Sequence, residues 1–98
     1  MAVVRYAAAA EEDLLQIWLT IAAENPTAAD RVLDEIDRYA RVLSEQPLMG
    51  KVRPELAPEV RSLPTRTPYI LFYLPQTDGL VVVRVLHHAR DIQDIFQP

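Results

Sequence analysis

Two apolar runs joined by a short turn, in the last third of the chain, limit most strongly what this sequence can fold into. Residues 69–73 read YILFY and residues 80–86 read LVVVRVL. Both are rich in the β-branched and aromatic side chains that suit a pleated, buried surface. Between them, Asp78 and Gly79 supply the left-handed backbone of a tight turn. The pattern predicts a central β-hairpin whose second strand runs into HHARD at 87–91.

The first half of the chain predicts two helices that form an antiparallel hairpin. The first has three acidic residues at 11–13, where the helix dipole favours negative charge. Asn25 and Pro26 end this helix and begin the next, because Asn caps a helix and Pro at its first position wastes no amide. Apolar residues at helical spacing mark one face of each helix: Leu14, Ile17, Trp18 and Ile21, then Ala29, Val32, Leu33, Ile36, Ala40 and Leu43.

The remaining segments complete an α+β fold. Residues 46–58 contain three prolines and one glycine and are not expected to hold regular structure for long. Residues 59–63 predict an edge strand, residues 2–7 a short first strand, and the residues after 92 a last helical turn. The prediction is one domain, 1–98, with a short N-terminal strand and an antiparallel helix hairpin packed on a three- to four-stranded, mainly antiparallel sheet. Trp18 and Phe72 are expected to be buried between the helices and the sheet.

Composition excludes several classes of function. The net charge of −4 argues against direct binding of nucleic acid by this chain alone, since such proteins cluster Lys and Arg against phosphates. No apolar stretch is long enough to cross a bilayer, so we expect no membrane partner. The chain has no Cys, and its start lacks the order of a secretion signal. These features predict a cytoplasmic protein.

Nine of the ten basic residues are Arg, and those after residue 51 are candidates for contact with a partner. An Arg-bearing face on an otherwise acidic body would bind carboxylates or phosphates in a directional way. The alternative is a scattered, solvated set. The candidates for binding a target or an inhibitor are Arg53, Arg61, Arg66, Arg84 and Arg90.

His87 and His88 are the candidates for acid–base chemistry, because imidazole titrates near neutrality. We expect them to point to opposite faces of a strand, and no Cys or spaced His accompanies them. No metal and no cofactor is therefore predicted. The alternative interpretation is one structural and one exposed His. For Arg90 and Asp91 we expect a local ion pair that closes the end of the strand.

Several short segments, taken in order, resemble a known family. They are EEDLLQIW at 11–18, NPTAA at 25–29, PLMG at 47–50, VRS at 60–62, YILFY at 69–73 and VRVLHHARD at 83–91. Together they resemble the ParE branch of the ParE/RelE toxin superfamily, also called plasmid stabilisation proteins. The resemblance implies the toxin of a type II toxin–antitoxin pair that binds DNA gyrase without catalysis. It also implies a partner antitoxin, ParD-like or another small antitoxin, that wraps the toxin surface.

Two other functions stay open. The related RelE branch cuts mRNA on the ribosome with basic residues and often a late Tyr, because such chemistry needs cations near the scissile bond. This chain has a single Lys and no Tyr in its segment 94–96, which favours the non-catalytic branch. A ribosome-dependent mRNA endonuclease is the first alternative, and a degenerate homologue that only binds its antitoxin is the second. For the antitoxin we expect a hydrophobic groove between helices and sheet, with Arg at its rim.

Overall fold

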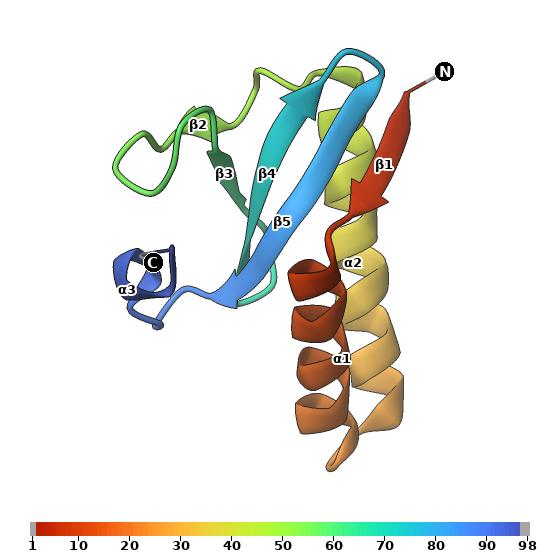
Figure 1. Cartoon of the computed structure of the whole chain (residues 1–98). Coiled ribbons are helices and arrows are strands. Elements are labelled where there is room, and N and C mark those ends of the chain that lie inside the picture. Colours follow the sequence, from red (N-terminus) through yellow and green to blue (C-terminus); the bar gives the residue numbers. More distant parts are fainter. Residues whose placement is uncertain (1, 97–98) are drawn as a thin grey trace.

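The structure, a computed structural model, describes residues 2–96. Two long helices lie side by side against one face of a five-stranded sheet, and a short third helix lies on the other side (Figure 1). The α+β prediction is therefore confirmed. In chain order the elements are β1 (Val3–Tyr6), α1 (Ala8–Ala22), α2 (Pro26–Glu45), β2 (Lys51–Val52), β3 (Arg61–Pro64), β4 (Tyr69–Gln76), β5 (Gly79–His87) and α3 (Ile92–Phe96).

The sheet has the strand order β1-β5-β4-β3-β2. β1 runs parallel to β5, and the other neighbours are antiparallel. The sheet is thus larger than the three to four strands predicted. The extra strand is β2, in which Lys51 and Val52 pair with Ser62 and Arg61. Two residues carry too weak a pattern to be seen in sequence, so this pairing within the Pro-rich loop was missed.

Gly79 is required at the hairpin turn for two reasons. Its φ is 149°, a conformation that side chains rarely adopt. A Cβ there would also lie 1.9 Å from the backbone oxygen of Val3, because β1 passes directly beside it. Arg5 on β1 donates two hydrogen bonds to Asp78, at 3.1 and 2.8 Å, and these hold the pKa of that carboxyl below its usual range. The turn and the first strand therefore stabilise each other.

The helix hairpin forms as predicted. The side chain of Asn25 accepts a hydrogen bond from the backbone nitrogen of Ala28 at 3.0 Å, which caps α2. The inner sides of both helices pack on one face of the sheet in the main core, whose buried residues are Ala10, Ile17, Ile36, Ala40, Leu43, Leu71, Tyr73, Leu80, Val82 and Val85.

Trp18 does not take its predicted place between helices and sheet. It is only partly buried, and its Nε1 donates a hydrogen bond to the carboxylate of Asp30 on α2 at 2.8 Å. The predicted face of α1 was therefore too wide by one residue. Its inner side is Leu14, Ile17 and Ile21, and Trp18 spans the two helices instead.

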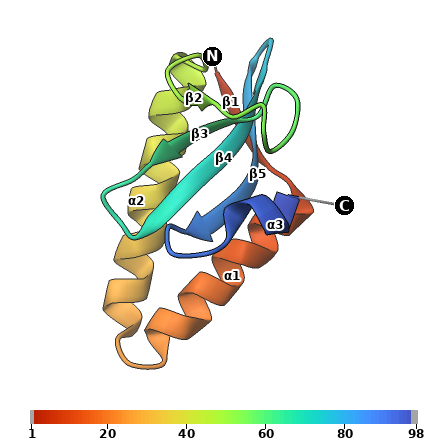
Figure 2. The same cartoon turned by 90° about the vertical axis from the view of Figure 1, so that its left-hand side faces the viewer.

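Phe72 is fully buried, but on the opposite face of the sheet from the helix hairpin. It packs with Leu56, Val60 and Leu86, and the ring of Phe96 in α3 lies 5.2 Å from its ring. Figure 2 shows α3 in front of the sheet on this side. The position of Phe72 was predicted wrongly because β4 is apolar on both faces, so alternation could not decide which face met the helices.

Tyr73, also on β4, fixes the turn that follows α2. Its hydroxyl donates to the carbonyl of Pro47 at 2.7 Å and accepts from the nitrogen of Gly50 at 2.9 Å. A Cβ at Gly50 would lie 2.4 Å from that hydroxyl, so only Gly fits. Burial raises the pKa of Tyr73. The buried phenol of Tyr73 thus fixes the conformation of the segment PLMG at 47–50.

Within residues 2–96, none of the three helices combines the length and the apolar character needed to cross a bilayer.

Candidate functional site

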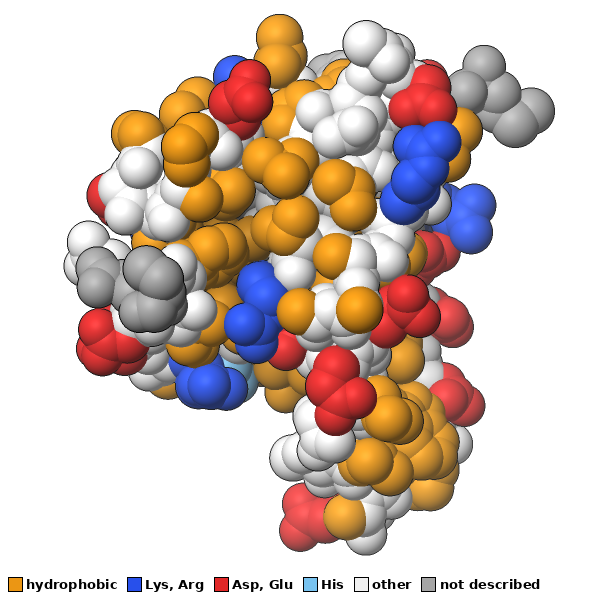
Figure 3. Space-filling view, in the orientation of Figure 1, with side chains coloured by type: hydrophobic (Ala, Val, Ile, Leu, Met, Phe, Trp, Pro, Cys, Tyr) orange, Lys and Arg blue, Asp and Glu red, His pale blue; other side chains and the backbone are white. Residues whose placement is uncertain are grey.

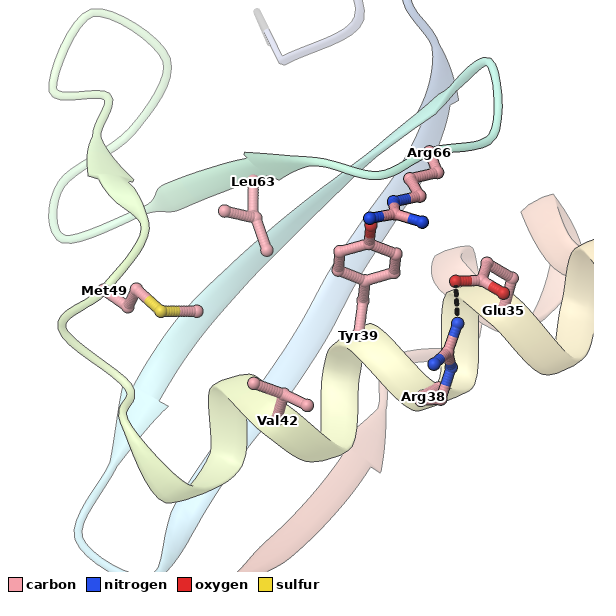
Figure 4. A pocket seen from close by; sticks show the side chains of 7 residues that line it. All are labelled: Glu35, Arg38, Tyr39, Val42, Met49, Leu63 and Arg66. Carbon is pink, nitrogen blue, oxygen red and sulfur yellow. Dashed lines mark hydrogen bonds and ion pairs between the residues drawn. The ribbon is translucent and has the colours of Figure 1, made fainter.

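A groove runs along α2, between this helix and the segment that joins β3 to β4. It consists of two hollows of about 360 and 370 Å³ that share Glu35, Arg38 and Arg66. Figure 4 shows one of them, with Tyr39 projecting from α2 toward Arg66, and with Leu63 of β3 on the opposite wall. We call this surface the α2 groove; it is lined by Ala28, Arg31, Val32, Glu35, Arg38, Tyr39, Val42, Met49, Leu63, Arg66, Thr67 and Pro68.

Both walls of the α2 groove are well supported. The α2 wall is one helix side, since its residues recur three or four apart. The opposite wall is a loop held by Thr65, whose hydroxyl donates to the carbonyl of Tyr69 at 2.8 Å and accepts from the nitrogen of Thr67 at 3.1 Å. The loop that carries Arg66 is therefore fastened to its own strands. Such a groove is largely formed before anything binds.

The α2 groove has apolar walls and a positive rim. Tyr39, Val42, Met49 and Leu63 provide the apolar surface, and Val42 and Met49 are about half exposed, at 51% and 48%. Three arginines and one glutamate line the groove, an excess of two positive charges on a chain whose net charge is −4. The acidic side chains gather elsewhere, for instance on the helix hairpin (Figure 3). An acidic partner with apolar anchors fits this groove.

Of the five arginines predicted as binding candidates, two hold the β2–β3 region of their own chain. Arg53 donates to Glu55 at 2.6 Å and to the hydroxyl of Ser62 at 3.1 Å, and this contact lowers the pKa of Glu55. Arg61 donates to the carbonyls of Leu48 and Gly50 at 3.0 and 2.8 Å. Both guanidinium groups are thus engaged inside the fold.

Arg84 is engaged by α1. Its Nε and Nη2 each donate to the carboxylate of Asp13 at 2.8 Å, and these hydrogen bonds raise the pKa of the guanidinium. The same carboxylate accepts from the backbone nitrogen of Val85 at 2.9 Å. Since β1 pairs only with Gly79 to Val82, Asp13 covers the part of the β5 edge that β1 does not reach.

The predicted acid–base pair lies at the end of β5. The strand stops at His87, so His88 is in the turn and the rings stack 4.6 Å apart; the expectation that they point to opposite faces is wrong. His87 Nδ1 accepts from the nitrogen of Ala89 at 3.0 Å. The backbone contact thus occupies Nδ1 of His87.

Arg90 lines a hollow of about 250 Å³ together with Asp13, Gln16 and His87. Among residues 2–96, no ion pair joins Arg90 to Asp91, contrary to expectation. The neighbouring carboxyl of Asp91 instead raises the pKa of Asp94. No three potential metal ligands come together in the described part of the chain.

Arg66 is therefore the one predicted candidate that the structure places in the α2 groove. Its neighbours there, Arg31 and Arg38, were missed because they read as exposed partners of helical ion pairs. Arg38 does pair with Glu35, while no ion pair holds Arg31 or Arg66 among the described residues. The sequence did contain one signal of this groove: Val42 is an apolar residue of the helix that lies outside the predicted buried stripe.

Comparison with known proteins agrees with this architecture. Residues 4–92 match the family described as ParE toxin of type II toxin-antitoxin system, parDE. The class of protein is thus the toxin component of a type II toxin–antitoxin system. Within that class, the chain belongs to the ParE toxin family, which confirms the resemblance seen in the sequence.

One solved structure shares the fold over most of both chains. It is described as the chromosomal ParDE TA system from P. aeruginosa, and it superposes with a TM-score of 0.74 at 20% identity, over 89% of this chain and 96% of that one. At this identity the likeness shows the fold alone. No curated protein sequence matches the chain.

Proposed function

We propose that residues 1–98 form one toxin domain that acts in the cytoplasm by binding DNA gyrase, and that a cognate antitoxin neutralises it by filling the α2 groove. The observation that carries the antitoxin proposal is the positive, apolar-walled groove on a negatively charged chain. Apolar anchors supply affinity in such grooves, and rim charges steer the encounter.

Two of the four residues considered for catalysis at the end of β5, His87 and Arg84, are held by other groups of the fold. A ribonuclease needs a proton acceptor and a cation that faces the phosphate. His87 Nδ1 is occupied by a backbone N–H, and Arg84 is held by Asp13. These two candidates are thus committed to the fold.

The antitoxin proposal is tested by charge reversal in the groove. The chain is co-expressed with the ParD-like product of the neighbouring gene, and the affinity of the purified complex is measured at low and high salt. Arg31→Glu with Arg66→Glu should weaken the complex about tenfold or more, most strongly at low salt. Arg90→Glu is the matched control and should bind like the parent. Equal weakening by the control would place the antitoxin elsewhere.

The target is tested by two assays on the same preparation. Supercoiling by purified gyrase should be inhibited, and primer extension on cellular mRNA should show no new cuts. His87→Gln and His88→Gln, separately and together, should keep growth inhibition within a few fold of the parent. Loss of toxicity in a folded His variant, together with loss of mRNA cuts made by the parent, would instead establish the ribosome-dependent endonuclease. A parent that inhibits neither target but binds the antitoxin would be the degenerate homologue.

A further inference from the structure

Helix α1 is apolar on two opposite sides, and only one of them is covered. Its inner side packs in the main core through Ala10 and Ile17. On its outer side, Leu15 and Leu19 are 50% and 49% exposed. On a helix of a globular protein the side that faces solvent is normally polar, and an apolar side is normally covered. The outer side of α1 therefore lacks the cover that its sequence calls for.

The two exposed leucines form one continuous row with two partly buried residues, Trp18 and Ala22. Residues 15, 18, 19 and 22 recur at i, i+3, i+4 and i+7, so they share a helix side. We call Leu15, Trp18, Leu19 and Ala22 the α1 stripe. Figure 3 shows hydrophobic side chains gathered on the lower part of the helix hairpin, with acidic side chains around them. The stripe shares no residue with the α2 groove.

Trp18 is held in place within this stripe. The hydrogen bond from its Nε1 to Asp30, 2.8 Å long, ties the indole across the two helices. A large aromatic side chain that is already ordered loses little entropy on binding, and Trp is enriched among the residues that dominate interface energies. The stripe thus has a preorganised anchor flanked by two leucines.

The rim of the α1 stripe is acidic. α1 contains Glu11, Glu12 and Asp13 and no Lys or Arg, and Asp13 is neutralised by Arg84. Across the hairpin, Asp30 and Asp34 are exposed. A second copy of the chain would bring two such rims together, which like charges oppose. The occupant must instead carry positive charge.

We propose that the α1 stripe is a docking surface for a basic amphipathic helix of a partner protein. A row at i, i+3, i+4 and i+7 packs against the matching row of another helix. Lys or Arg beside the apolar row of that partner would meet Glu11, Glu12 and Asp30. The proposal is independent of the antitoxin and gyrase assignments, because it uses a different surface and the opposite charge.

The test uses Trp18, the one tryptophan of the chain, as a fluorescent reporter at the surface itself. The probe is a synthetic amphipathic helix of leucine and lysine, titrated into the purified toxin; a leucine–glutamate helix of equal length is the control peptide. The leucine–lysine helix should shift the Trp18 emission, and its affinity should fall as salt is added. Absence of binding, or equal binding of the leucine–glutamate helix, would overturn the proposal.

Matched variants locate the contact. Leu15→Ser with Leu19→Ser should weaken binding of the leucine–lysine helix about tenfold or more, at an unchanged melting temperature. Val42→Ser, a similarly exposed apolar residue in the α2 groove, should bind like the parent. Glu11→Gln with Glu12→Gln should reduce the salt dependence. Equal loss of binding in Val42→Ser would show that the peptide binds at another site. A Trp18 signal that depends on toxin concentration without peptide would show that the chain associates with itself. Either result would contradict the proposal.

Discussion

The two helices of the hairpin differ in the residues that surround their exposed apolar side chains. On α2 one apolar side packs in the core, and some surface charges pair within the fold, as Asp37 does with Arg41, while the half-exposed Val42 lies in the α2 groove. α1 is apolar inside and outside, and its acidic residues lie mostly at its start. The exposed apolar residue of α2 thus lies beside arginines, whereas Leu15 and Leu19 lie on a helix that has acidic residues and no Lys or Arg. The two helices therefore present exposed apolar residues in surroundings of opposite charge.

The largest effect is expected for two residues of α1 that lie on opposite sides of the helix. Ile17 is 6% exposed and Leu19 is 49% exposed. Ile17→Ala should lower the free energy of unfolding by about 2–5 kcal/mol, through lost burial and a cavity. Leu19→Ala should change it by less than about 0.5 kcal/mol. Urea denaturation of the two variants measures both values. Similar losses would mean that α1 has no outer surface in solution.

A smaller effect separates the acidic residues at the start of α1. Asp13 accepts three hydrogen bonds, from Arg84 and from the nitrogen of Val85, whereas Glu12 is exposed. Asp13→Ala leaves the Val85 N–H without its partner and should cost about 1–3 kcal/mol. Glu12→Ala is the control and should be close to neutral. Thermal melts compare them, and a neutral Asp13→Ala would mean that the β5 edge needs no cover.

The smallest effect tests a hydrogen bond between β1 and α2, and it is seen in the stability at high pH. Tyr6 on β1 donates to Asp37 at 2.8 Å; burial, then this hydrogen bond, raises the pKa of its phenol well above the ordinary value. The unfolded state therefore releases this proton first. Stability is fully present below the ordinary Tyr pKa of about 10 and is lost as pH rises from there through the folded pKa.

Tyr6→Phe should accordingly flatten the alkaline fall in stability, at a cost of about 1 kcal/mol near neutral pH. Chemical denaturation across a pH series gives both numbers. A variant that keeps the full alkaline fall would assign it to another group, of which Tyr73 is the first to examine because burial also raises its pKa.

Much of the fold could be predicted from sequence, and the reasons are local. Asn25 and Pro26 mark a helix boundary by their own chemistry, and the turn at Asp78 and Gly79 needs a backbone that Gly alone adopts readily. The faces of β4 could not be predicted, because a strand that is covered on both sides shows no alternation. β2 could not be predicted because its two residues form a strand only through contact with β3.

The candidate site was harder to predict, because Arg side chains are long and their partners are distant in sequence. Arg61 reaches the carbonyls of Leu48 and Gly50, which depends on the path of a loop that carries no pattern of its own. Arg84 meets Asp13 across more than seventy residues. Sequence gives the number of arginines, and only the fold decides which of them, such as Arg31 and Arg66, face a groove.

The close passage of β1 beside Gly79 has a consequence for how the chain reaches its folded state. The helix hairpin and the β4–β5 hairpin are closed by neighbouring residues and can form early. β1 is synthesised before both, yet its partner in the sheet begins at Gly79, 76 residues later. Until β5 has left the ribosome, the first strand has nothing to pair with. The parallel edge of the sheet is therefore among the last parts to assemble, and a substitution at Gly79 should appear as slower folding as well as lower stability.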